Sequence, residues 1–124
     1  MKPSWSELLA AAREEVESTL SLLPEPLREA ARALPVSYQR RPSAEMVADG
    51  LDDDLLGLFV GDSHAEGGAG SALPSQILLF LENLWEFAEG DWGIFEEEVQ
   101  TTYLHELGHY LGLDELDLEE RGLE

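Results

Sequence analysis

Apolar residues recur at helical spacing over the first part of the chain, with glutamates between them. Ser4 and Glu7 stand three residues apart at its start, which is the spacing of a capping box. The pattern predicts a helix from about Trp5 to Leu22, ended by Pro24. A short second helix is predicted next from its apolar positions Leu27, Ala30, Ala31 and Leu34.

Three later segments have the character of strands. Residues 36–40 alternate between apolar and polar, whereas residues 55–60 and 76–81 are continuous apolar runs bounded by turn residues. The acidic run at 52–54 lacks the ligand spacing of a calcium loop, so we interpret it as a solvated turn. Helical patterns follow at 83–89, at 94–111 and, in a last short helix, at 113–123.

Length and composition indicate one domain over residues 1–124. The chain has no cysteine, which excludes disulfides and thiolate metal sites. It has no apolar run long enough to span a membrane and no secretory signal, so we expect a cytoplasmic protein.

The charge is strongly negative and unevenly distributed. Lys and Arg total 7 against 27 Asp and Glu, for a formal net charge of −20, and residues 63–124 alone carry −14. Such a surface repels nucleic acids and anionic membranes, and it favours cationic ligands and metal ions. Solubility alone would also account for it. The pair Arg40-Arg41 either contacts a partner or balances nearby acids.

The helix predicted over 94–111 carries the candidate chemistry. Its apolar residues fall on one broad side, and His105 and His109 fall together on the opposite side, one turn apart. Two imidazoles at this spacing can bind one zinc ion. Glu106 lies too near the pair to be a comfortable third ligand, but it can reach a water bound to the metal. A chance match to H-E-x-x-H is the competing explanation.

A third ligand is expected just after this helix. Gly112 stands where the helix must end and the chain turn back, and Asp114 and Glu115 follow. A catalytic zinc takes three protein ligands, and His-His-carboxylate is an accepted set. We favour Glu115 for its longer reach, with Asp114 as the alternative, since Asp114 would also serve as the N-cap of a last helix.

The segment His105-Glu-Leu-Gly-His109-Tyr-Leu-Gly112-Leu-Asp-Glu115 resembles the metzincin motif H-E-x-x-H-x-x-G-x-x-H, with Glu where that family has its third His. Over roughly residues 55–122 the chain is similar to a family of small bacterial zincin-like zinc metallopeptidases, whose motif ends in Asp or Glu. The resemblance implies an α+β fold: a small mixed sheet, a packed N-terminal helix, and an active-site helix followed by a short C-terminal helix. It also implies an acidic third ligand at 115. No methionine follows the motif, so the metzincin Met-turn is absent.

These features predict a zinc-dependent peptidase, in which Glu106 is the general base and the cofactor is one Zn²⁺ ion. The substrate would be a peptide or protein, with a cationic one favoured by the charge. Residues Gln76, Ile77, Leu78 and Leu79 are the candidate strand edge for pairing with it. An ordinary core strand is an equally good interpretation of this segment.

Two questions stay open at this level. Tyr38 and His64 are candidate donors to the developing oxyanion, whereas Tyr103 and Tyr110 are expected in the core. The alternative function is a non-catalytic, zinc-stabilised acidic module that binds a basic protein. The sequence does not indicate an oligomeric state.

Overall fold

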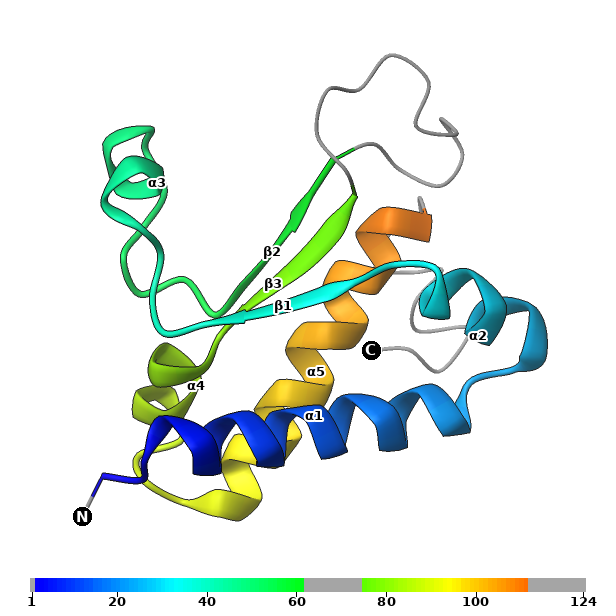
Figure 1. The fold of residues 1–124 in the computed structure, drawn as a ribbon, viewed down its shortest axis with the longest axis horizontal. Helices are drawn as coiled ribbons and strands as arrows, with labels where there is room; N and C mark the ends of the chain where they lie inside the picture. The colour runs from blue at the N-terminus through cyan, green and yellow to red at the C-terminus, as the bar shows by residue number, and fades with distance from the viewer. Residues whose placement is uncertain (1, 62–74, 112–124) are drawn as a thin grey trace.

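The computed structural model of the chain describes residues 2–61 and 75–111. Three strands and five helices lie in this part (Figure 1), and the helix predicted over 113–123 lies outside it. In chain order they are α1 (Trp5–Leu22), α2 (Glu25–Arg32), β1 (Val36–Gln39), α3 (Ala44–Ala48), β2 (Gly57–Val60), β3 (Gln76–Phe80), α4 (Leu81–Phe87) and α5 (Trp92–Leu111). The predicted α+β architecture is confirmed.

Helix α1 begins and ends as its sequence predicts. The Ser4 side chain accepts a bond from the Glu7 amide at 3.2 Å, and the Ser4 amide donates to the Glu7 carboxylate at 3.1 Å, so the capping box is complete. Its buried residues follow the helical repeat: Leu8, Ala12, Val16, Thr19 and Leu20. Only α3 was not expected, and the Ser43 side chain caps it by accepting from the Met46 amide.

The sheet has the order β1-β3-β2. Strand β3 runs parallel to β1, with Val36 opposite Ile77, and antiparallel to β2, with Phe59 opposite Ile77. All residues of β3 from Ile77 to Phe80 are buried, as a continuous apolar strand between two neighbours requires. In the described part of the chain, β1 and β2 are therefore the outer strands.

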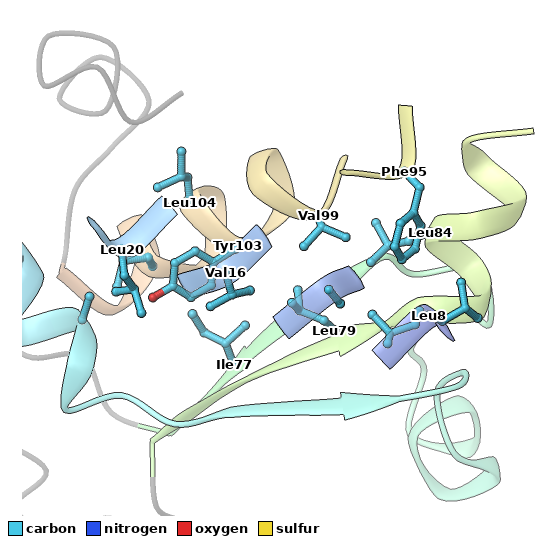
Figure 2. Close-up of a cluster of buried hydrophobic side chains, with 14 of the residues drawn as sticks. Leu8, Val16, Leu20, Ile77, Leu79, Leu84, Phe95, Val99, Tyr103 and Leu104 are labelled. Carbon is cyan, nitrogen blue, oxygen red and sulfur yellow. The ribbon is translucent and has the colours of Figure 1, made fainter. Parts of the chain in front are cut away.

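The core lies between one face of the sheet and two long helices. Side chains from α1, β3, α4 and α5 interdigitate there (Figure 2), among them Leu8, Val16, Ile77, Leu79, Leu84, Val99 and Tyr103. Helix α5 contacts both α1 and the strands β2 and β3. This packing holds α5 across the sheet, which is the arrangement that positions the candidate site.

Candidate metal centre

Helix α5 carries the candidate metal-binding group, His105, Glu106 and His109. The Asp91 side chain accepts from the Ile94 amide at 3.0 Å near its start, and Glu89 and Gly90, both with positive φ, form the turn from α4. Its buried residues are Phe95, Val99, Thr102, Tyr103, Leu104, Leu107 and Gly108, which confirms the apolar face that the spacing predicts. His109 is exposed on the opposite side.

The two histidines are set for one ion. Their Nε2 atoms lie 3.3 Å apart, and the candidate ligand atoms of His105, Glu106 and His109 all lie within 4.8 Å of one another. Two nitrogens bound to a tetrahedral zinc at the usual bond length are separated by about 3.3 Å. The separation of the two histidine nitrogens therefore suits zinc without rearrangement of the helix.

Glu106 points from α5 towards strand β2. Its Oε1 accepts a 3.1 Å hydrogen bond from the backbone amide of Phe59. The Phe80 amide donates to the Leu56 carbonyl, so the backbone groups of Leu56 face β3. Along an antiparallel strand this direction alternates from one residue to the next, so the amide and carbonyl of Phe59, three residues on, face away from β3. Glu106 thus binds the outer edge of β2, and one of its two carboxylate oxygens is occupied by this bond.

A glycine lets β2 approach the helix this closely. A Cβ on Gly57 would lie 2.5 Å from Cγ2 of Thr102 and 3.2 Å from the carbonyl oxygen of Leu78. Thr102 stands one turn before Glu106 on α5. The contact therefore sets the separation of strand and helix beside the metal-binding side chains.

A cavity opens from the site along α5. Its volume is about 330 Å³, and its lining is Leu55, Leu56, Gly57, Glu98, Thr101, Thr102, His105 and Glu106. It shares two residues with the metal-binding group, so the cavity and that group are continuous. No motif in the sequence pointed directly to this cavity, although a glycine inside a strand pattern is typical of a close approach to a helix or ligand.

The basic residues near the sheet are held away from the metal-binding group. Arg40 donates to Glu82 at 2.8 Å, Lys2 lies 3.7 Å from the same carboxylate, and Arg41 pairs with Glu82 and Glu86. The hydrogen bond from Arg40 is the main cause that lowers the pKa of Glu82. The Arg40-Arg41 pair therefore balances nearby acids, one of its two predicted roles.

Asn83 is a structural residue that the sequence did not reveal. Its buried side-chain amide donates to the carbonyls of Asp53 and Leu55 at 2.8 and 2.9 Å, and its oxygen accepts from Arg41 at 2.7 Å. These bonds fix the segment that leads into β2 and forms one wall of the cavity. Because α4 also carries Glu82 and Glu86, a further polar residue in it was no distinct signal.

The strand expected to pair with substrate is in the centre of the sheet. Gln76, Ile77, Leu78 and Leu79 belong to β3, whose two sides are hydrogen-bonded to β1 and β2. A peptide has no edge of β3 on which to pair, contrary to that expectation. The outer edge that faces α5 is that of β2.

The remaining predicted residues divide into three groups. Tyr103 is fully buried, which raises the pKa of its hydroxyl, and Tyr110 is half-buried against Phe59, so both pack as expected. Tyr38 lies on β1 with β3 between it and β2, so the structure does not bring it to the site. The positions of Glu115, Asp114 and His64 lie outside the described residues.

Comparison with protein families gives a match over most of the chain. The family model described as zincin-like metallopeptidase matches residues 31–123, three quarters of the chain. No curated protein matches the sequence significantly. In the described residues, no helix combines the length and hydropathy needed to cross a bilayer.

Proposed function

Because the chain belongs to the zincin-like metallopeptidase family, we propose that it hydrolyses peptide bonds with one zinc ion held by His105 and His109. The observation that carries this proposal is the 3.3 Å separation of the two Nε2 atoms, which suits tetrahedral zinc. Glu115 is the proposed third ligand, with Asp114 as the alternative. A carboxylate in this place would complete a His-His-acid set.

Zinc, when bound, polarises the scissile carbonyl and makes water a better nucleophile near neutral pH. In this proposal Glu106 accepts the proton of the attacking water and delivers it to the leaving amine. The Phe59 amide holds Oε1 of Glu106, which orients the carboxylate and leaves its other oxygen for proton transfer. The peptide would lie beside the outer edge of β2, since that edge faces Glu106, and it would pair with groups other than the Phe59 amide, which Glu106 engages.

We further propose that the substrate is cationic. The described basic residues are engaged elsewhere: besides the three around Glu82, Arg32 pairs with Glu17, Arg28 donates to the Ser21 carbonyl and Arg13 lies over the Tyr38 ring. Glu98, which lines the cavity beside the candidate metal group, takes part in none of these ion pairs, in a chain of net charge −20. Such a surface attracts basic peptides.

The test combines elemental analysis with cleavage of a peptide library that includes basic sequences. We expect about one zinc per chain in the wild type and in Glu106→Gln, and much less in His109→Ala. Cleavage should be lost in Glu106→Gln and unchanged in Glu97→Gln, an exposed carboxylate on the same helix. Zinc binding without any cleavage by the wild type would favour the non-catalytic binding module, and negligible zinc in the wild type would overturn both.

A further inference from the structure

We propose that the cavity beside the metal-binding group is a specificity pocket for a lysine or arginine side chain, and that Glu98 selects it. The inference rests on the proposed function, because it concerns the residue next to the scissile bond. It goes further by assigning one carboxylate of this chain to substrate selection.

The position of the cavity defines what can enter it. Its lining includes His105 and Glu106, so a substrate whose carbonyl lies at the metal has a neighbouring side chain at the cavity mouth. Its volume of about 330 Å³ lies at the lower end of the range for ligand pockets. A lysine or arginine side chain fits within this volume.

The lining suits a side chain that is apolar along its stem and charged at its tip. Leu55 and Leu56 form apolar walls, and Thr101 and Thr102 add small side chains. Glu98 is the lining carboxylate that the proposed mechanism does not use. Lysine and arginine bury an aliphatic stem against apolar surface while their charged group reaches a polar partner.

The spacing along α5 requires a long side chain. Glu98 precedes His105 by seven residues, and at the rise of an α-helix this places their Cα atoms about 10 Å apart along the axis. A short polar side chain at the metal would not reach Glu98, whereas lysine and arginine are the longest cationic side chains.

The charge around Glu98 is uncompensated. Glu98 is half-buried, and none of the hydrogen bonds or ion pairs of the described residues engages it. None of the basic residues in the described part lines the cavity. A cationic substrate group would supply the missing partner of Glu98. A half-buried ion pair contributes more binding free energy than one on the open surface.

The first test measures binding without turnover. Two peptide hydroxamates, which chelate zinc, are compared on the zinc-loaded protein by calorimetry. The two compounds differ only in carrying lysine or norleucine next to the hydroxamate. A second such pair has the hydroxamate at the other end of the peptide, so that both sides of the scissile bond are sampled. We expect the lysine compound to bind about tenfold more tightly to the wild type in one of the two arrangements.

Two variants assign that preference to Glu98. The preference should disappear in Glu98→Gln, which keeps the size and helix propensity of the side chain, and reverse towards a glutamate-bearing hydroxamate in Glu98→Lys. It should persist in Glu97→Gln, since Glu97 does not line the cavity. Zinc content should be equal in all four proteins.

The results separate the pocket from the peptidase activity. Equal binding of the lysine and norleucine compounds by the wild type, a preference that survives in Glu98→Gln, or no binding of either compound would each overturn the pocket. Cleavage of peptides irrespective of a basic residue would support the peptidase and overturn the pocket. A lysine preference that depends on Glu98, without any cleavage, would support the pocket and overturn the proposed hydrolysis.

Discussion

The backbone amide of Phe59 donates a 3.1 Å hydrogen bond to Oε1 of Glu106. This bond joins the outer strand of the sheet to the helix that carries both histidines, across 47 residues of sequence. The bond fixes the orientation of the Glu106 carboxylate. Its donor is a backbone amide, which among substitutions at position 59 only proline removes. The position of the proposed general base is therefore a property of how β2 and α5 pack.

The first prediction concerns this bond. Phe59→Pro removes the amide donor, whereas Phe59→Ala keeps it and loses the ring that packs on Tyr110. Because the Phe59 amide faces away from β3, the sheet should tolerate proline there. We expect kcat to fall about tenfold or more in Phe59→Pro relative to Phe59→Ala, as for loss of one bond to a charged group. Equal kcat values in the two folded variants would contradict the orienting role.

The second prediction concerns the approach of Gly57 to Thr102. Gly57→Ala places a Cβ 2.5 Å from Cγ2 of Thr102, so strand and helix must separate. We expect a loss of about 1–3 kcal/mol in the free energy of unfolding, measured with urea. Thr102→Ser removes the clashing methyl, so the double variant should recover part of that loss. Additive effects in the double-mutant cycle would show that the two residues are not coupled.

The third prediction concerns metal removal. A ligand that binds only the folded state raises the free energy of unfolding, so added zinc should raise the Tm of the wild type and a chelator should reverse the change. His109→Ala should show a much smaller zinc-dependent shift, measured by thermal unfolding followed by circular dichroism. A shift of the same size in both proteins would mean that zinc acts at another place.

The fourth prediction concerns Glu82. The hydrogen bond from Arg40, aided by Lys2 and Arg41, lowers the pKa of Glu82 below its usual 4.5 although burial opposes this. A lowered pKa in the folded state contributes stability that is present above 4.5 and is lost as the pH falls through the folded value. The wild type should therefore exceed Glu82→Gln in free energy of unfolding at about pH 6, and the difference should shrink towards about pH 3.

Urea unfolding of both proteins across this pH range is the measurement. The difference between the two free energies of unfolding reports on Glu82 alone, because the other carboxylates are the same in both proteins. Among these, Glu15 has a pKa raised by burial and by the nearby Glu96 and Glu14, so it changes stability with the opposite sign. A difference that is independent of pH would contradict the role of the Arg40 bond.

Local signals in the sequence predicted the helices well. The Ser4–Glu7 capping box set the start of α1, and the apolar repeat placed the buried and histidine-bearing faces of α5. These features could be predicted because each depends on residues within one or two turns. The pairing of His105 with His109 is of the same kind, since both stand on one helix.

The order of the strands could not be predicted in this way. The sheet joins β3 to strands that precede it by about 20 and 40 residues, and short apolar runs do not specify their partners. For this reason the edge was expected at Gln76–Leu79 rather than on β2. The bond of Glu106 to Phe59 and the cavity at Glu98 depend on the same long-range packing, so they too appear only in the structure.

The family match begins at residue 31, inside α2, and so leaves all of α1 outside it. Yet Leu8, Ala12, Val16 and Leu20 of α1 complete the core against which α5 packs. The homologous segment is thus smaller than the folding unit, and a protein cut at the family boundary would expose the back of its metal-binding helix to water. In this chain the matched segment rests on a helix outside the match, so the resemblance and its structural support have different boundaries.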